Sequence, residues 1–344
     1  MNKRIPDFDN ILCALKRECP KRPTLFELFM NMPLYETVNG RKHTGADMLS
    51  ELAFTAEAFA RLGYDYVTTH ASRMSFPTRR HAHLSTISLN EGGLISDWES
   101  FESYPWPKPE EYDSSHLQDI KKHLPGNMKL MVMGPGGVLE NVISIVGYES
   151  LCYMLYEDTD LVKVLFDQVG LILENYYARA LDYDTVGLIS SNDDWGFNTQ
   201  TFLSPAQMRA YVFPWHKRFV DLAHAAGRPI LLHSCGNLKD VMEDVIAMGF
   251  DVKHSFEDGI QPVEEAYEQY HGRIAIAGGM DVDFICRESE EAIRQRVRAM
   301  IERTGTRGGY LIGTGNSVPS YMPQNKYLAM VKEAIGYDPL TQAE

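Results

Sequence analysis

From residue 44 onward, amphipathic helical stretches alternate along the chain with short apolar runs. The apolar runs predict strands over residues 64–69, 129–133, 185–189, 230–232, 251–253, 273–277 and 309–312, and residues 24–29 are counted as an eighth strand. The amphipathic stretches predict helices over residues 45–62, 148–181 with a break near 158–160, 238–248, 263–270, 290–303 and 325–335, with a further helix opening at Ser204-Pro205. Alternation of this kind implies parallel strands joined by helical crossovers, and eight units predict a closed (β/α)8 TIM barrel in a single domain, residues 1–344.

Residues 74–112 interrupt the alternation. The segment contains Pro77, Arg79, Arg80, His81 and His83, followed by YPWPKPEEYD. We interpret it as an insertion, for instance an extended hairpin, that covers one mouth of the barrel. Arg79 and Arg80 are candidates for binding a substrate carboxylate, although arginines without a specific role are common in exposed loops.

The composition restricts the class of protein. A formal net charge of −14 over 344 residues argues against a nucleic-acid surface, which needs a basic stripe. No run of about 18 uninterrupted apolar residues predicts a membrane span, and the start MNKRIPDFDN lacks the apolar core of a signal peptide. Five cysteines, at positions 13, 19, 152, 235 and 286, do not form a disulfide framework. We therefore expect a cytoplasmic protein that binds neither nucleic acid nor membrane.

The most informative motif is His233-Ser234-Cys235-Gly236-Asn237, where the strand over residues 230–232 runs out into a turn. Alternate residues of a strand share a face, so the imidazole and the thiol can point at one place. Both are good zinc ligands, but zinc needs about three or four ligands and only two are local. The alternative is a buried thiol beside a hydrogen-bonded histidine.

Further polar side chains follow the ends of the other predicted strands. In a TIM barrel these ends form one rim, which carries the active site. The candidate residues on this rim are His70, Asp193, Asp194, Trp195, His233, Cys235, His254, Glu257, Asp281, Asn316 and Tyr321. Single Gly, Asn or Asp residues in such loops are often explained by turn geometry. Histidine, cysteine and carboxylates at successive strand ends instead predict a catalytic or metal site.

The candidates divide into three roles. Asp193 and Asp194 are expected as a metal ligand and a general acid, unless one of them only caps a turn. Glu257 is expected as a ligand or proton donor, the alternative being a carboxylate placed at a helix N-terminus by the dipole. The residues expected to contact substrate are His70, Trp195, His254, Asp281, Asn316 and Tyr321. Core packing is the alternative for the two large aromatic residues, and a solvated turn for Asp281.

The barrel pattern, HSCGN at 233–237, YPWP at 104–107 and GGYLIGTGN at 308–316 together resemble the uroporphyrinogen decarboxylase superfamily over essentially the whole chain. Within it the chain is most similar to the cobamide-dependent methyltransferases. Their zinc site uses a His-x-Cys pair, matched by His233 and Cys235, and a further cysteine after a late strand, where this chain has Asn316. The resemblance thus implies a zinc ion with at most two ligands of the family pattern.

Loss of one thiolate ligand leaves a more electron-poor zinc, which is a better Lewis acid toward an ether oxygen. The resemblance then implies a methyltransferase of the O-demethylase type, with a small O-methyl donor and a cobamide carried by a separate corrinoid protein. Glu257 or an aspartate would complete the zinc site, and Asp193 or Asp194 would protonate the leaving oxygenate. The barrel mouth would also be the docking face for the corrinoid protein, and a homodimer is possible.

Two alternatives remain open. Decarboxylases proper carry an arginine-rich N-terminal segment that binds the porphyrinogen carboxylates. The corresponding residues 22–43, RPTLFELFMNMPLYETVNGRKH, show no such match. A non-catalytic barrel that binds a corrinoid protein is the other alternative, and Asn316 is the residue that favours it.

Overall fold

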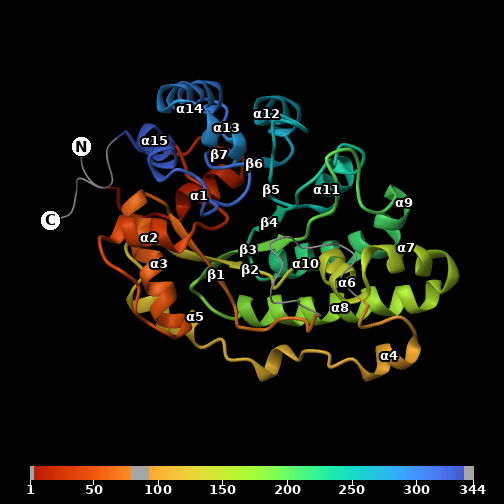
Figure 1. Ribbon diagram of the computed structural model, residues 1–344. Helices are drawn as coiled ribbons and strands as arrows, with labels where there is room; N and C mark the ends of the chain where they lie inside the picture. Colours follow the sequence, from red (N-terminus) through yellow and green to blue (C-terminus); the bar gives the residue numbers. More distant parts are fainter. Residues whose placement is uncertain (1–3, 79–92, 337–344) are drawn as a thin grey trace.

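The computed structural model describes residues 4–78 and 93–336 (Figure 1). Its centre is a parallel sheet whose strands are hydrogen bonded in chain order, each to the next. The seven strands are β1 Tyr66–His70, β2 Lys129–Met133, β3 Val186–Asn192, β4 Ile230–His233, β5 Val252–His254, β6 Ala275–Ala277 and β7 Tyr310–Leu311. Six of them have bounds within two residues of a strand expected from the apolar runs, and β3 begins within one residue of its expected start but runs three residues further, so the parallel α/β architecture is confirmed.

Helices cover the outside of this curled sheet (Figure 1). Their bounds are α1 Asp9–Leu15, α2 Met32–Asn39, α3 Met48–Leu62, α4 Trp98–Ser103, α5 His116–Asp119, α6 Val138–Val146, α7 Tyr148–Glu157, α8 Thr159–Leu181, α9 Pro205–Gln207, α10 Phe213–Ala225, α11 Met242–Met248, α12 Val263–Tyr270, α13 Val282–Arg287, α14 Glu290–Thr304 and α15 Gln324–Ile335. Short turns of other helix types are η1 Pro109–Glu111, η2 Ile120–Lys122 and η3 Met208–Val212. Strand side chains are buried on both faces, as in β2 and β3, because one face packs on helices and the other fills the interior.

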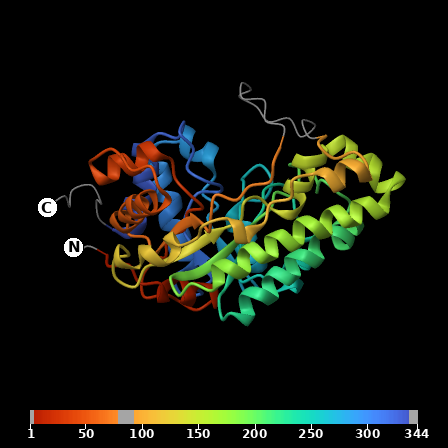
Figure 2. The same ribbon diagram turned by 90° about the horizontal axis from the view of Figure 1, so that it is seen from below.

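The eighth strand differs from the expectation. Residues 24–26 lie next to the residue that follows β7, to which they are joined by one parallel bridge between Leu25 and Ile312. In the described part of the chain they form no strand. On the other side the segment contacts β1 through a side chain: the Tyr66 hydroxyl accepts from Glu27 N at 2.7 Å and donates to Glu27 O. Figure 2 shows the first and last segments of the chain, red and blue, side by side. A seven-stranded parallel sheet is therefore shown, and the closed eight-stranded barrel is not.

The crossover from β1 to β2 contains the predicted insertion. Its described part forms α4 and η1 and no strand, so an extended hairpin is wrong for residues 74–78 and 93–112. The rings of Tyr104 and Trp106 pack together here at 4.5 Å between centroids. Arg79, Arg80, His81 and His83 lie outside the described residues.

No single helix in residues 4–78 and 93–336 has both the length and the apolar composition of a membrane span. Only the pair α6 and α7, bent by 95° at the break, passes that test jointly, by length and composition alone.

Candidate metal centre

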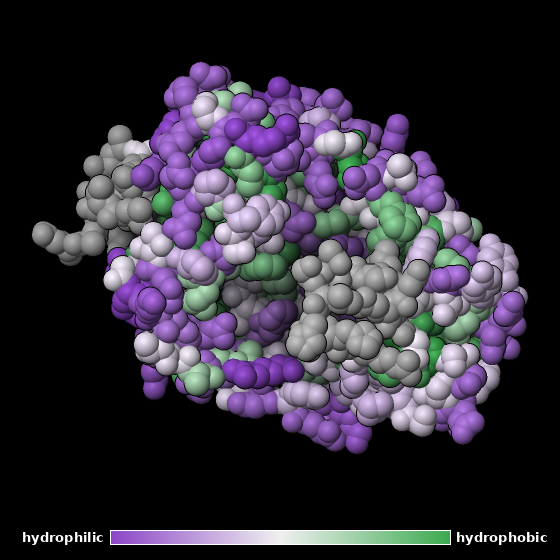
Figure 3. All heavy atoms as spheres, viewed as in Figure 1, coloured by the Kyte–Doolittle hydropathy of each residue, from purple (hydrophilic) through white to green (hydrophobic). Residues whose placement is uncertain are grey.

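The ends of three neighbouring strands position the site. The parallel register pairs Asn192 of β3 with His233 of β4, and His233 with His254 of β5. Asp194 and Cys235 follow two residues after Asn192 and His233, so their side chains reach the same rim. This face of the molecule is hollowed near its middle (Figure 3).

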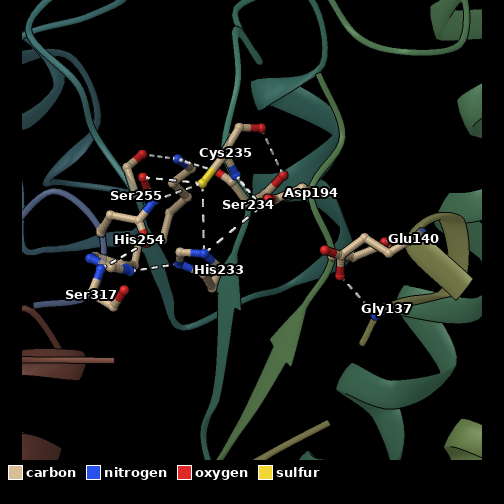
Figure 4. Close-up of polar contacts among 12 residues, drawn as sticks. Gly137, Glu140, Asp194, His233, Ser234, Cys235, His254, Ser255 and Ser317 are labelled. Carbon is tan, nitrogen blue, oxygen red and sulfur yellow. Dashed lines mark hydrogen bonds and ion pairs between the residues drawn. The ribbon is translucent and has the colours of Figure 1, made fainter. Parts of the chain in front are cut away.

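Asp194, His233 and Cys235 bring one ligand atom each to within 4.8 Å of one another. His233 Nε2 lies 3.8 Å from Cys235 Sγ and 3.8 Å from Asp194 Oδ1, and Asp194 Oδ1 also accepts from Cys235 N at 2.8 Å (Figure 4). The spacing prediction for His233 and Cys235 is confirmed. Of the two candidates for a third ligand, an aspartate or Glu257, the cluster found among the described residues contains Asp194 and not Glu257.

Hydrogen bonds fix which nitrogen of His233 faces this cluster. Burial lowers the pKa of His233 to about 3 and that of His254 well below its usual range, so both rings are neutral. His254 Nε2 lies 3.1 Å from the Thr314 carbonyl oxygen, which only accepts, so Nε2 carries the His254 proton. His254 Nδ1 then accepts from His233 Nδ1 at 2.8 Å. His233 Nε2 is left with a free lone pair directed at Cys235 and Asp194.

Asn316 lies next to the thiol, where the family resemblance expects a cysteine. Its Oδ1 accepts from Ser317 N at 2.8 Å, which directs Nδ2 to Cys235 Sγ at 3.3 Å. Burial, with the Asp194 carboxylate nearby, raises the pKa of the Cys235 thiol. Burial also raises the pKa of Asp194. Lys253 acts in the opposite direction on both groups, but burial outweighs it, so the anions of Asp194 and Cys235 are destabilised where they stand.

These residues fit a zinc ion. Zinc bonds of about 2.0–2.3 Å at tetrahedral angles separate two ligand atoms by about 3.6 Å, close to the 3.8 Å that joins His233 Nε2 to each of the other two ligand atoms. A neutral imidazole nitrogen, a thiolate and a carboxylate are all zinc ligands, and a cation would stabilise both anions. Three protein ligands leave the fourth position open, as in catalytic zinc sites.

Asp193 does not face this cluster. It is fully buried, and its carboxylate accepts from Leu139 N at 3.0 Å, from Glu140 N at 2.9 Å and contacts His216 Nε2 at 2.9 Å. Gly137 makes this approach possible, because a Cβ there would lie 2.1 Å from Asp193 Cβ. The capping alternative therefore describes Asp193, although the helix it caps is α6.

Two expected substrate contacts lie inside the protein. Trp195 is fully buried, and its ring packs 5.2 Å from Phe213 and 4.9 Å from His216. His254 is also fully buried, with both ring nitrogens engaged. For Trp195 the core-packing alternative fits. His254 does not face open space; instead its ring accepts a hydrogen bond from His233 and orients that ring.

The remaining candidates line open space. Glu257, Asp281, Asn316 and Tyr321 border a cavity of about 330 Å³. Burial and the Asp281 carboxylate raise the pKa of Glu257. Asp281 also caps α13, since its Oδ1 accepts from Phe284 N at 2.9 Å. His70 is exposed at the end of β1, and its carbonyl oxygen contacts His116 Nε2 at 3.0 Å.

The sequence analysis missed two residues beside the cluster. Glu140, in the first turn of α6, points toward it from the side of Asp194 (Figure 4), and burial with the neighbouring Asp193 and Asp194 raises its pKa well above its usual range. Lys253 is buried, with Nζ donating to Ser234 O at 3.2 Å and to Ser255 O, and burial lowers its pKa to about 8. A lysine inside a short apolar strand was the available signal. For Glu140 it was the glycine turn three residues earlier.

A family model described as uroporphyrinogen decarboxylase (URO-D) matches residues 95–337. Among solved structures, the chain is similar to a methyltransferase from Methanosarcina mazei, with 16% identity over 94% of this chain and 97% of that chain and a TM-score of 0.68, which is a likeness of fold. It also matches a B12-independent methionine synthase from Shewanella sp. W3-18-1 in complex with selenomethionine, with 13% identity over 60% of this chain and 61% of that one, at a TM-score of only 0.41. No curated protein matches the sequence.

Proposed function

Since this chain belongs to the uroporphyrinogen decarboxylase family, we propose that it is a zinc-dependent methyltransferase that passes a methyl group from a small O-methyl donor to a corrinoid protein. The observation that carries the proposal is the cluster of Asp194, His233 and Cys235, with the free lone pair of His233 Nε2 directed into it. The likeness in fold to a methyltransferase supports the same branch of the family.

Asp194, His233 and Cys235 would hold the zinc ion. When bound, zinc supplies a Lewis acid that polarises the ether oxygen of the donor. With one thiolate, one imidazole and one carboxylate, the ligand set is poorer in sulfur than a His-Cys-Cys set, which favours oxygen over thiol substrates.

The chain's own residues would do the rest of the work. In transfer of the methyl group to a corrinoid partner, the electron pair of the broken C–O bond would stay on the donor oxygen, which would then need a proton. Glu140 is the proposed donor, because its carboxyl lies beside the cluster and has one oxygen, Oε2, on Gly137 N at 3.0 Å, whereas both oxygens of Asp193 are engaged by α6 and His216. Asp194 acts as a ligand in this assignment, and Glu257, Asp281 and Tyr321 face the donor.

The cavity beside Asn316 favours this function over porphyrinogen decarboxylation. Three carboxylates, Glu257, Asp281 and Asp283, line it, and among the described residues no Lys, Arg or His does. Such a lining repels a substrate that carries many carboxylates and accepts an uncharged donor.

Metal content and a direct assay test the proposal. Purified protein is expected to hold one zinc per chain, lost in His233→Ala, and to methylate free cob(I)alamin from a methoxy compound such as 2-methoxyphenol. Protein that binds no zinc, or metal-free protein that decarboxylates uroporphyrinogen, would contradict it. Zinc binding and tight association with a corrinoid protein, without methyl transfer from any donor, would indicate the non-catalytic barrel instead.

A further inference from the structure

Glu27 is a fully buried carboxyl group that the proposed chemistry does not use. It forms no ion pair among the described residues. Among the described residues its carboxyl oxygens form hydrogen bonds with Thr314 alone: Oε1 accepts from Thr314 N at 2.9 Å, and Oε2 lies 2.6 Å from Thr314 Oγ1. The Tyr66 hydroxyl holds the main chain of Glu27 on both sides. A buried acid without a cation nearby is costly unless it is neutral.

The hydrogen bonds around Thr314 favour a neutral Glu27. The Thr314 hydroxyl has one proton, yet its oxygen contacts both Glu27 Oε2 at 2.6 Å and the Asn316 carbonyl oxygen at 3.0 Å. With an ionised Glu27 the single Thr314 proton would be shared between the two oxygens, whereas a neutral Glu27 that donates to Thr314 Oγ1 leaves that proton for Asn316 O and gives two full hydrogen bonds. Burial raises the pKa of Glu27 to about 8, which agrees with this count.

Thr314 leads from Glu27 to two atoms of the candidate metal cluster. Its carbonyl oxygen accepts from His254 Nε2, and His254 Nδ1 accepts from His233 Nδ1, so the lone pair of His233 Nε2 faces the cluster. Its hydroxyl contacts the Asn316 carbonyl, and the Asn316 side chain reaches Cys235 Sγ at 3.3 Å. One side chain from the N-terminal segment thus connects to a ligand nitrogen and to the ligand sulfur.

We propose that Glu27, as a neutral acid, is a positioning residue for the metal centre: it fixes Thr314, and through Thr314 the ring of His233 and the amide beside Cys235. Loss of a group that hydrogen bonds directly to a metal ligand commonly costs about 10- to 100-fold in metal affinity. Glu27 acts on two such groups at once, His254 and Asn316, and on both through Thr314. The proposal rests on the cation site of the proposed function and is independent of the methyl donor and of the corrinoid partner.

The test compares zinc affinity, measured by chelator competition, with the absorption spectrum of the Co²⁺-substituted protein and with thermal unfolding. Glu27→Ala is expected to weaken zinc binding about 10- to 100-fold and to shift the Co²⁺ bands. Glu27→Gln keeps one acceptor and one donor, so it is expected to restore both readouts. Thr314→Val removes only the hydroxyl, and its expected effect is a smaller loss of affinity with altered thiolate-to-cobalt bands.

Asp65→Ala is the matched control. Asp65 is a buried carboxyl with a hydrogen bond to Asp7 N and an ion pair to Arg22, at the opposite end of β1 from His70. Its loss is expected to lower the melting temperature without changing zinc affinity or the Co²⁺ spectrum.

Folded Glu27→Ala with wild-type zinc affinity and spectrum would overturn the inference, as would a loss in Glu27→Gln as large as in Glu27→Ala. Should Glu27→Ala not fold, Glu27→Gln and Thr314→Val decide alone, and an unchanged spectrum in Thr314→Val counts against it. Wild-type protein that binds neither metal would instead remove the proposed function.

Discussion

His233 and His254 face each other through their Nδ1 atoms at 2.8 Å, and only one of those two nitrogens can carry a proton. The Thr314 carbonyl on the far side of His254 assigns that proton to His233. An imidazole that supports another imidazole in this way sets the tautomer of a ligand without contacting the cation itself.

Replacing His254 should therefore weaken metal binding. His254→Phe fills the space beside Phe26 but cannot accept from His233 Nδ1. We expect a loss of zinc affinity of about 10-fold or more, measured by chelator competition. His123→Ala, at the end of η2, serves as the control and should bind zinc normally. Equal affinity in both variants would show that the contact does not orient His233.

The residue at position 316 should affect how strongly the proposed zinc ion acts as a Lewis acid. Asn316→Cys places a second thiol beside Cys235, so we expect tighter zinc binding and stronger thiolate-to-cobalt absorption in the Co²⁺ form. Methyl transfer from an ether donor should fall, because a more electron-rich zinc polarises oxygen less. Asn316→Ser controls for loss of the amide. A rise in activity with Asn316→Cys would refute the argument from ligand charge.

Glu140→Gln should lower the rate of methyl transfer by about 100-fold or more, since general acids commonly contribute factors of 10²–10⁴. Zinc affinity should not change, because Glu140 is not in the cluster. The defect should shrink for 4-nitroanisole, whose leaving oxygen needs little help from an acid. Glu157→Gln, at the end of α7, is the control. A uniform defect across donors would indicate that Glu140 does not protonate the leaving group.

The neighbouring aspartates should separate stability from metal binding. Asp193→Ala removes a buried partner of His216 and two backbone acceptors at α6, so we expect metal-free protein to lose about 3 kcal/mol of unfolding free energy. Asp194→Ala should change the stability of metal-free protein much less and abolish tight zinc binding. Urea unfolding and zinc titration distinguish the two, and the reverse pattern would exchange their roles.

Glu27 should give metal-free protein a defined pH dependence. Its pKa is raised to about 8 in the folded chain, so the folded state holds a proton that the unfolded state releases above its own, lower pKa. The associated stability is complete at acid pH and is lost as the pH rises from about 4.5 to 8. Glu27→Gln does not titrate, so its stability relative to wild type should rise over that range by about 1.4 kcal/mol per pH unit. A difference independent of pH, measured by urea unfolding, would show that Glu27 is ionised throughout.

Much of the fold and part of the site follow from local pattern. The strand over Lys129–Met133 and the helix over Val263–Tyr270 have the expected bounds, because a single apolar periodicity and clear boundary residues define each. The spacing of His233 and Cys235 placed both beside one another, and the uroporphyrinogen decarboxylase resemblance is confirmed by the family match. These features depend on residues close together in the sequence.

What the sequence could not supply depends on pairing across the chain. Asp193 and Asp194 are adjacent and chemically identical, and only the register of β3 against β4 decides which of them turns toward Cys235. Glu27 looks like any polar residue of an edge strand until Thr314, 287 positions later, is placed against it. Between β1 and the segment that contains Glu27, the Tyr66 hydroxyl takes the place of strand pairing by bonding to the main chain of Glu27. A side-chain contact of this kind cannot be predicted from the pattern of apolar residues.

The contact between Glu27 and Thr314 has a consequence for when the proposed metal site can be complete. During synthesis, both halves of the His-x-Cys pair leave the ribosome some eighty residues before the threonine that aligns them, as the printed numbering shows. At that stage the thiol and the imidazole of the nascent chain are still free to rotate, so we expect them to bind a cation weakly. If the proposed ion binds, its tight binding would therefore have to wait until the segment with Glu27 and the segment with Thr314 have packed together.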